Sequence, residues 1–499
     1  MYRIIVVGLA LAATPLNAQM APPLTRAAAT ITAHDVAHRI GIIADDSMMG
    51  RDTPSRGLEL TARYIGSQFR KFGLQPGGDQ DGWLQRYSIT RRRLNLGQSR
   101  IVFATGGHRE VAALGSWARY EGGAVPDQAL QGPALLVGGA QTAETAKDIP
   151  VANKVVLYAA PPKLEAEEMQ DVLRTLFRAG PRALILVSGV DSASFAASLP
   201  RSASTRTVIG APTGPVVVQV WEGAVQHTLR AAGADLVTVR SSGAPIAREL
   251  PRLTVSVELK DSISNSVSAP NAVGILEGSD PRLKHEYLVY SAHMDHIGIS
   301  PGQPDSINNG ADDDASGTVG VVELAEAFSR PGARPKRSII FLTVSGEEKG
   351  LWGSKYFSEH PVVPVAQLVA DINIDMIGRN WPDTIVAIGK EHSDLGATLN
   401  RVNAAHPELG MTAIDDRWPE EQFYFRSDHY NFARKGVPIL FFFNGVHPDY
   451  HAVTDSPDKI NSEKEARILQ LLFYLGQEIG NAPERPKWNP ESYREIVEH

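Results

Sequence analysis

Four apolar runs of buried-strand length alternate with helix-like segments in the second half of the chain. The runs are residues 286–292, 338–344, 368–374 and 437–443. A helical pattern covers about 315–328, and the capping box Ser462…Glu465 predicts the start of a last helix. Strands that alternate with helices form largely parallel sheets that are buried on both faces. We therefore predict an α/β fold in which a mixed, largely parallel sheet is sandwiched by helices.

Residues that can bind metals or transfer protons follow these strands. Ligands of such sheets gather beyond the carboxyl ends of the strands, so this edge is where chemistry is expected. Each strand end or following loop contributes a histidine or a carboxylate: His293-Met294-Asp295-His296, Asp312-Asp313-Asp314, Glu347-Glu348, Asp375 and Tyr450-His451. Any one of these residues alone is typical of an ordinary surface or core position. Their shared place at one edge of one sheet predicts a common site.

The composition limits the chemistry of this site and the partners of the chain. The 499 residues include no cysteine, which excludes disulfides, thiolate nucleophiles and cysteine-bound zinc. Any metal must then be held by His, Asp and Glu. The formal net charge of -7 gives no sign of the basic surface that nucleic acid or an anionic membrane requires. We therefore expect no nucleic-acid partner.

Residues 1–18 have the features of a secretory signal peptide. Arg3 gives a positive start, an apolar run extends from Ile4 to Ala13, and Leu16-Asn17-Ala18 forms a cleavage site. The apolar run is too short to span a bilayer, which takes about 20 residues. We therefore expect an exported protein, periplasmic or secreted, with no membrane span in the mature chain.

The donor set at the sheet edge suits a pair of zinc ions. Zinc prefers imidazole nitrogen and carboxylate oxygen, and a catalytic zinc keeps one position open for water. Two histidines and three carboxylates, one of them bridging, match two ions about 3.5–4 Å apart. A carboxylate beside them that is not a ligand can take a proton from bound water and pass it to the leaving amine. The adjacent Glu347 and Glu348 can divide these two roles, and the expected cofactor is Zn²⁺, two ions per chain.

Further motifs accompany these residues along most of the chain. They are Gly50-Arg51, Phe72-Gly73-Leu74-Gln75-Pro76 and the segments 271–295, 310–317, 346–353, 375–379, 427–438 and 450–455. With these motifs in this order, the chain resembles the co-catalytic zinc exopeptidases, which include bacterial leucyl aminopeptidases and glutamate carboxypeptidases. The resemblance implies a zinc-dependent exopeptidase that acts on peptide substrates, in first place as an aminopeptidase.

The resemblance also implies a set of metal ligands. His293 and Asp375 would bind one zinc, Glu348 and His451 would bind the other, and Asp313 would bridge the two ions. Neighbouring acids and imidazoles are left outside this ligand set: Asp312, Asp314, Asp371, His296 and His429.

Four further residues receive roles from the same resemblance. Glu347 would be the general base, and Asp295 would orient His293 through a hydrogen bond. Tyr450 would stabilise the tetrahedral oxyanion through its hydroxyl group. Arg426 would contact the substrate.

The chain before this region has a different pattern of predicted helices and strands. Residues 34–75 have a helical pattern, and short β-like runs at 134–137, 154–158 and 183–187 alternate with a helical stretch near 164–178. The segments 151–158 and 178–187 resemble the protease-associated domain that some members of the family carry. The predicted organisation is a signal peptide at 1–18, an N-terminal part of the peptidase domain at 19–110, a smaller α/β protease-associated insert at 111–245, the zinc peptidase domain at 246–485 and a C-terminal tail at 486–499.

Three other functions are weighed against the aminopeptidase. A carboxypeptidase of the glutamate carboxypeptidase type would cleave N-blocked dipeptides, whereas an aminopeptidase cleaves aminoacyl arylamides. A glutaminyl cyclase would hold a single zinc, and the pair Glu347-Glu348 argues against it. A receptor-like relative without activity would have lost ligands, whereas all five are present here. The side-chain preference and the oligomeric state stay open.

Overall fold

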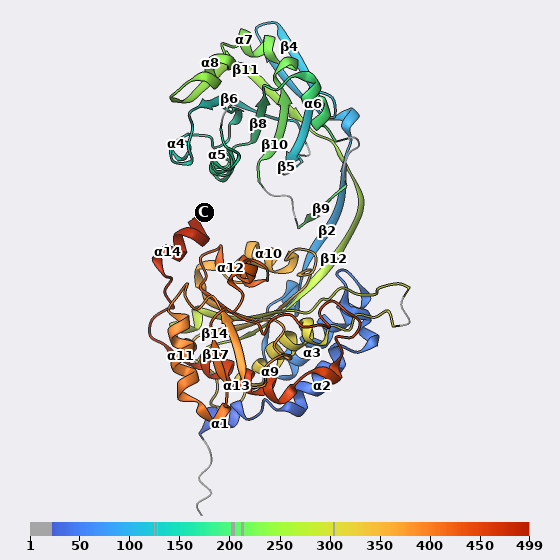
Figure 1. Cartoon of the computed structure of the whole chain (residues 1–499), viewed down its shortest axis with the longest axis vertical. Helices are drawn as coiled ribbons and strands as arrows, with labels where there is room; N and C mark the ends of the chain where they lie inside the picture. Colours follow the sequence, from blue (N-terminus) through green and yellow to red (C-terminus); the bar gives the residue numbers. More distant parts are fainter. Residues whose placement is uncertain are drawn as a thin grey trace, which may run out of the picture. The chain divides into compact units, whose positions relative to one another are not determined.

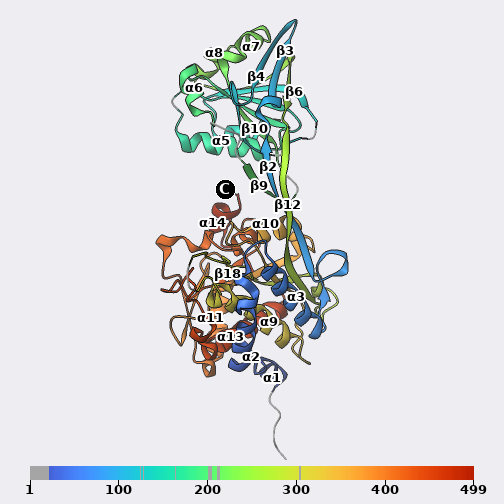
Figure 2. The same ribbon diagram turned by 90° about the vertical axis from the view of Figure 1, so that its right-hand side faces the viewer.

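The computed structural model describes residues 22–498, apart from residues 124, 127, 163, 201–204, 211–213, 303 and 304. The predicted signal peptide, residues 1–18, lies outside the described residues. The chain divides into two units, which are unit 1 (Met1–Arg86 and Ala269–His499) and unit 2 (Tyr87–Ser268) (Figure 1, Figure 2). In the described part of the chain, no helix combines the length and the apolar character that a bilayer crossing requires.

Unit 1 is built on a mixed sheet whose middle strands are parallel. Its strands are β1 (Gln75–Pro76), β13 (Tyr287–His293), β14 (Ser338–Val344), β15 (Leu368–Ile374), β16 (Thr384–Ile388), β17 (Thr412–Ile414) and β18 (Ile439–Phe442), together with the first residues of β2 (Leu84–Leu94) and the second half of β12 (Asp261–Leu276). The order is β17-β16-β18-β15-β13-β14-β12-β2, with β1 also paired to β12. Strand β13 pairs in parallel with β14 and β15, and β15 with β18, whereas β12 and β16 pair antiparallel to this group. The predicted α/β fold class with a mixed, largely parallel sheet is confirmed.

Helices cover both faces of this sheet (Figure 1). They are α1 (Pro23–Ala28), α2 (Ala33–Ile43), α3 (Arg56–Lys71), α9 (Gly317–Phe328), α10 (Trp352–Glu359), α11 (Leu395–Ala405), α12 (His429–Ala433), α13 (Ser462–Asn481) and α14 (Pro490–Tyr493). Helices α9 and α13 contact β13, and α2 packs against α9 and α13. Helix α12 contacts β15 and β18, and α10 packs against α12. All residues of β14 and β15 are buried, as expected for strands covered on both sides.

Two expected helix boundaries differ from the structure. The segment 34–75 is not one helix, because α2 ends at Ile43 and α3 begins at Arg56. Gly50 in the turn between them has φ +66°, and a Cβ there would lie 2.4 Å from the carbonyl oxygen of Gly298, so the chain turns where only glycine fits. The capping box is wrong as well: α13 is capped by Asn461, whose side chain accepts a hydrogen bond from the backbone N–H of Lys464 at 3.1 Å.

The described part of the C-terminal segment, residues 486–498, is packed within unit 1. It contains α14 and a helical turn at Arg494–Glu498, and Ile496 is buried in the hydrophobic core beside β18. Nε1 of Trp488 donates a hydrogen bond to the carbonyl oxygen of Gly436 at 2.9 Å. The described part of this segment therefore contributes to the core of unit 1.

Unit 2 contains a second mixed sheet with its own hydrophobic core. The strands of this sheet are β3 (Arg100–Thr105), β4 (His108–Ala113), β5 (Ala118–Gly122), β6 (Leu130–Gly139), β7 (Val155–Ala159), β8 (Ala183–Ser188), β10 (Val216–Trp221) and β11 (Pro245–Glu258). Strand β9 (Thr205–Ile209) pairs antiparallel with β2 instead. The helices of unit 2 are α4 (Ala143–Lys147), α5 (Ala166–Arg178), α6 (Ser192–Ser198), α7 (Gln226–Ala231) and α8 (Leu236–Ser241). The order is β4-β3-β11-β6-β7-β8-β10-β5, with parallel pairing from β6 to β10. The predicted strands at 134–137, 154–158 and 183–187 correspond to β6, β7 and β8.

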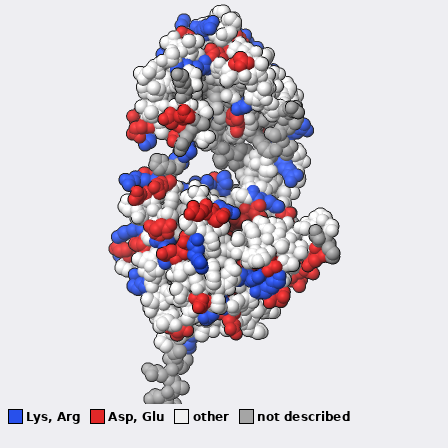
Figure 3. Space-filling view, viewed as in Figure 1, with Lys and Arg blue, Asp and Glu red and all other residues white. Residues whose placement is uncertain are grey.

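Unit 2 is wider than the insert expected at 111–245. Strand β11 pairs antiparallel with both β3 and β6, and β3 pairs with β4, so segments on both sides of the expected insert complete the same sheet. The expected boundaries therefore lie inside unit 2. In the space-filling view of Figure 3, Lys and Arg are interspersed with Asp and Glu over the viewed face of each unit.

Candidate metal centre

The carboxyl ends of the parallel strands in unit 1 carry the residues singled out in the sequence. Strand β13 ends at His293, and Asp375 follows β15 directly. Glu348 lies in the loop after β14, Asp313 lies in the turn that precedes α9, and His451 lies in the loop beyond β18. The fold therefore brings side chains from five segments to one edge of the sheet, where ligands of α/β sheets bind.

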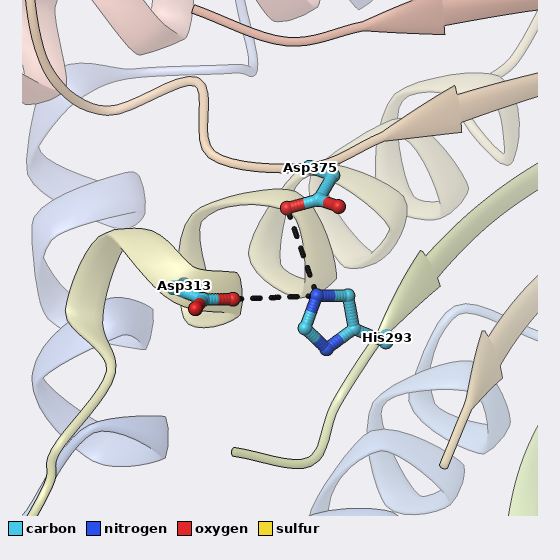
Figure 4. Close-up of side chains that lie close together, drawn as sticks. All are labelled: His293, Asp313 and Asp375. Atoms are coloured by element: carbon cyan, nitrogen blue, oxygen red, sulfur yellow. Dashed lines mark ion pairs between the residues drawn. The ribbon is translucent and has the colours of Figure 1, made fainter. Parts of the chain in front are cut away.

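The first group of donors consists of His293, Asp313 and Asp375 (Figure 4). Nε2 of His293 lies 3.4 Å from Oδ1 of Asp313 and 3.6 Å from Oδ1 of Asp375. Nδ1 of His293 is 3.2 Å from the backbone carbonyl oxygen of Asp295, which can only accept a hydrogen bond. In the neutral imidazole the proton is therefore on Nδ1, and the lone pair of Nε2 faces the two carboxylates. A lone pair and carboxylate oxygens repel each other, so this arrangement is favourable when a cation lies between them.

The second group surrounds the other oxygen of Asp313. Nε2 of His451 lies 3.1 Å from Oδ2 of Asp313 and 3.2 Å from Oε2 of Glu348. Oδ1 of Asp313 faces the first group and Oδ2 faces the second, so this one carboxylate lies between them. All five residues expected as ligands are thus brought together.

His296 also belongs to the second group, although it was left outside the expected ligand set. Its Nδ1 lies 2.9 Å from Oε1 of Glu348 and 3.5 Å from Oδ2 of Asp313, and its ring is fully buried. Its place three residues after His293, at the same strand end, puts it near the site in the sequence, but the resemblance implied no metal-binding role for it.

The geometry of these donors fits metal binding. Bonds of about 2.0–2.1 Å around a tetrahedral zinc place neighbouring donor atoms about 3.3 Å apart. Among the five residues expected as ligands, four histidine–carboxylate distances run from 3.1 to 3.6 Å. Imidazole and carboxylate are also the donor types that zinc binds. The residues therefore fit two metal positions that share Asp313.

The electrostatics of the site favour cations. Burial alone would lower the pKa of His293, but the negative charges of Asp375 and Glu347 raise this pKa well above its usual value. Hydrogen bonds to Asp313 and Glu348 raise the pKa of His451 to about 10. Both imidazoles thus report a strongly negative potential, which is the environment that a divalent cation requires.

Two further acids hold the loop that presents Asp313. Asp314 accepts hydrogen bonds from the backbone N–H of His293 at 3.2 Å and of Met376 at 3.2 Å, so it joins the ends of β13 and β15. Asp455 accepts a hydrogen bond from the backbone N–H of Asp313 at 3.1 Å. These carboxylates fix the backbone around the donors, and the peptide bond between Asp313 and Asp314 is cis.

Arg51 connects the same loops through hydrogen bonds to their backbone. Its fully buried guanidinium donates to the backbone carbonyl oxygens of Ile43 at 3.0 Å, Met294 at 2.9 Å, Asn309 at 2.5 Å and Gly310 at 2.8 Å. Burial lowers the pKa of Arg51, whereas surrounding carboxylates oppose this shift. The planar fork of arginine spreads five donors over three nitrogens and can reach four carbonyl groups at once, whereas a lysine ammonium has three donors on a single nitrogen.

Arg51→Lys is expected to lower the free energy of unfolding by about 3 kcal/mol, because buried carbonyl groups lose their donors. Denaturant unfolding of the metal-free protein measures this loss. Arg63→Lys is the matched control, since its side chain is 72% exposed, and it is expected to change stability by less than about 0.5 kcal/mol. An equal effect of the two changes would contradict the role of Arg51.

Asp295 lies beside His293 and Glu347. Its Oδ2 accepts a hydrogen bond from the hydroxyl of Thr53 at 2.9 Å, and its Oδ1 accepts one from the backbone N–H of Glu347 at 3.3 Å. Oδ1 lies 3.8 Å from Nδ1 of His293, which is farther than the backbone carbonyl oxygen of the same aspartate. Asp295 therefore contacts His293 mainly through its backbone in this structure.

Glu347 lines a cavity beside the first donor group without being a member of either group. Burial raises its pKa well above the usual value, and the nearby carboxylates of Asp428 and Asp375 act in the same direction, against the charge of His293. The remaining lining is mainly apolar and aromatic, with Met376, Phe423, Phe441, Phe443, Val446 and Tyr450. The cavity therefore places the carboxyl group of Glu347 and the metal-donor side chains next to an apolar surface.

Tyr450 and Arg426 lie at the cavity in different ways. The ring of Tyr450 stacks on His451 with 3.9 Å between ring centroids, and burial raises the pKa of Tyr450, which keeps its hydroxyl protonated. Nη1 of Arg426 lies 3.3 Å from Oε2 of Glu421, and its guanidinium lies 4.8 Å from the ring centroid of Phe423. Arg426 lines the cavity as well, but as an exposed residue that already has a partner.

The region that carries these residues is similar to known proteins. Residues 271–476 match the model of Peptidase family M28. The leupeptin-inactivating enzyme 1 of Streptomyces exfoliatus is 28% identical over 190 residues, which cover 38% of this chain and 39% of that protein. A probable zinc metalloprotease of Pyricularia oryzae is 34% identical over 267 residues, with 44% of this chain and 52% of that protein covered. The chain thus spans about half the length of the curated relatives it matches.

Solved structures are similar over most of the chain. An aminopeptidase from Aneurinibacillus sp. strain AM-1 aligns with a TM-score of 0.47 and 17% identity, covering 93% of this chain and 97% of that one. The zinc aminopeptidase BSAP from Bacillus subtilis aligns with a TM-score of 0.45 and 16% identity, covering 91% and 96%. Both donor groups fall within residues 271–476, the part of the chain that matches the model of Peptidase family M28, and the resemblance to the co-catalytic zinc exopeptidases is confirmed.

Proposed function

We propose that the chain is a zinc-dependent aminopeptidase that holds two ions and removes N-terminal residues from peptides. The observation that carries this proposal is the placement of Asp313, whose Oδ1 lies 3.4 Å from Nε2 of His293 while its Oδ2 lies 3.1 Å from Nε2 of His451. A carboxylate that faces two donor groups with its two oxygens is suited to bridge two metals. Asp375 completes the first position and Glu348 the second.

The residues around the two positions divide the work of peptide hydrolysis. When bound, the two ions would polarise the scissile carbonyl and make water at the site more acidic. Glu347 belongs to neither donor group, so its carboxylate is free to accept the proton of the attacking water and to pass it to the leaving amine. The protonated hydroxyl of Tyr450 donates a hydrogen bond to the developing oxyanion.

The character of the cavity favours a free N-terminus over a free C-terminus. Glu347 lines the cavity with a carboxyl group that belongs to neither donor group, and a carboxylate stabilises a nearby α-ammonium group. The aromatic lining by Phe423, Phe441 and Phe443 suits an apolar side chain at the first residue of the substrate. A relative from Arthroderma otae that is 26% identical over 231 residues is named a probable leucine aminopeptidase, which supports the same class.

Leucyl arylamides are expected to be hydrolysed much faster than aspartyl or lysyl arylamides. A chelator is expected to abolish this activity, and added zinc to restore it. Initial rates across the three substrates, before and after chelation, check this expectation. Activity that survives complete removal of the metal would contradict the proposal.

A carboxypeptidase is the second candidate, and one residue favours it. The guanidinium of Arg426 lines the cavity, and a guanidinium can bind the carboxylate of a C-terminal residue. The contact of Arg426 with Glu421 argues against this role, since the charge is already paired. Cleavage of an N-blocked dipeptide that is lost in Arg426→Ala would select the carboxypeptidase. Cleavage of aminoacyl arylamides that is unchanged in Arg426→Ala supports the aminopeptidase.

Export and the nature of unit 2 belong to the same proposal. We expect processing after Ala18, which N-terminal sequencing of the protein from the periplasm or medium would reveal. Unit 2 is proposed to be a protease-associated domain without chemistry of its own. Among the residues that the structure describes, both groups able to hold a metal lie in unit 1, which supports this assignment.

A further inference from the structure

His296 has one nitrogen at the centre of the site and one that faces nothing polar. Its Nδ1 lies 2.9 Å from Oε1 of Glu348 and 3.5 Å from Oδ2 of Asp313. Its Nε2 is buried and has no hydrogen-bond partner among the described residues. This asymmetry decides which nitrogen carries the proton.

The proton of His296 belongs on Nδ1. If Nδ1 instead bound a metal through its lone pair, the proton would be on Nε2, and a buried N–H donor would be left without an acceptor. Buried N–H groups without a partner are rare in proteins, whereas an unused acceptor costs less. With the proton on Nδ1, both facing carboxylate oxygens act as acceptors. His296 therefore donates to Glu348 rather than binding a metal directly.

The two oxygens of Glu348 then have different tasks. Oε1 accepts the hydrogen bond from His296, whereas Oε2 lies 3.2 Å from Nε2 of His451. Each oxygen of Glu348 therefore faces a different imidazole. A carboxylate with one oxygen engaged in a hydrogen bond is held in a single orientation.

Close packing fixes the imidazole that sets this orientation. A Cβ at Gly310 would lie 2.6 Å from Cγ and Cδ2 of His296, so the loop backbone at residue 310 lies directly against the ring. The ring meets that of His451 edge to face, with 5.6 Å between the centroids. The imidazole therefore has little freedom to turn Nδ1 away from Glu348.

We propose that His296 is a positioning residue, which donates from Nδ1 to Oε1 of Glu348 and thereby directs Oε2 to the second metal position. This inference rests on the proposed two-metal function. Hydrogen bonds to ligating carboxylates typically change metal affinity by about 10–100-fold. His296 therefore sets the affinity of the second ion, which Glu348 and His451 hold, and leaves the first ion to His293 and Asp375.

Three substitutions of His296 separate donation from simple space filling. The amide nitrogen of asparagine can take the place of Nδ1, whereas glutamine places its amide near the position of Nε2, and alanine has no donor. His296→Ala and His296→Gln are expected to weaken binding of the second zinc by about 10–100-fold, while His296→Asn keeps an affinity close to that of the wild type. Calorimetric titration of metal-free protein with zinc measures both binding steps.

Control variants and the visible spectrum of the cobalt-bound protein distinguish the loss of this hydrogen bond from a general loss of structure. His392→Ala and His392→Asn remove an imidazole whose Nδ1 lies 3.0 Å from the hydroxyl of Ser492, away from both donor groups, and they are expected to leave both affinities unchanged. Thermal unfolding of the metal-free variants identifies any that do not fold. With cobalt in the second position, the visible spectrum of His296→Asn is expected to match that of the wild type, because no metal ligand is lost.

Each other outcome would overturn the inference in a different way. Unchanged affinity for the second ion in His296→Ala would remove the positioning role. Equal losses in the asparagine and alanine variants, together with an altered cobalt spectrum, would make His296 a direct ligand. If the wild type binds fewer than two ions, the proposed two-metal function fails, and this inference fails with it.

Discussion

Asp313→Ala is expected to lose both ions and all peptidase activity together. Asp313 is the only residue whose carboxylate oxygens face both donor groups in the described structure, at 3.4 Å from His293 and 3.1 Å from His451. Removing it leaves each group with one carboxylate and uncompensated imidazoles, and it removes the charge that draws the two cations together. Metal analysis after dialysis should give far fewer than two zinc ions per chain, with rates as low as those of the chelated protein.

Asp371→Asn is the matched control for this prediction. Asp371 is a buried aspartate within β15 whose Oδ1 accepts a hydrogen bond from the hydroxyl of Ser291 at 2.7 Å, and it belongs to neither donor group. Burial raises its pKa well above the usual value, so a neutral amide resembles its preferred state. Metal content and activity should stay near the wild-type values. Two ions retained in Asp313→Ala would refute the bridging role.

Glu347→Gln is expected to keep two zinc ions per chain while kcat falls by about 10²–10⁴-fold, the usual contribution of a general base. Glu347 lines the cavity but is not part of either donor group, so an isosteric amide should disturb the proton transfer and leave the metal positions intact. Metal analysis and steady-state kinetics on the same preparation measure the two effects side by side.

The adjacent residue gives the sharpest comparison. Glu348→Gln is the same chemical change one position along the chain, and it should weaken the second ion because Oε2 of Glu348 lies 3.2 Å from His451. The two variants should therefore differ in metal content, although both lose activity. Turnover that persists in Glu347→Gln would remove this residue from the mechanism.

The sheet of unit 1 and its chemical edge could be predicted because the relevant signals are local. Runs such as 338–344 and 368–374 are apolar throughout, which is typical of strands buried on both faces, and the structure forms β14 and β15 at these residues. Parallel strands then place their following loops at one edge. The convergence of His293, Asp313 and His451 follows from this topology rather than from any single motif.

Other features depended on contacts between distant segments and could not be predicted. The turn at Gly50 interrupts the expected helix because the segment at Gly298 packs against it. The limits of unit 2 depend on the pairing of β11 with β3 and β6, which no local pattern reveals. His296 gave only a weak signal, since its significance comes from its distance to Glu348 across 52 residues of sequence.

The paired metal centre is tested most directly by anomalous diffraction from crystals of the zinc-loaded protein at the zinc absorption edge. We expect two peaks about 3.5–4 Å apart, one beside His293 and Asp375 and the other beside Glu348 and His451, with Asp313 between them. A single peak, or peaks that do not share Asp313, would contradict the two-metal centre.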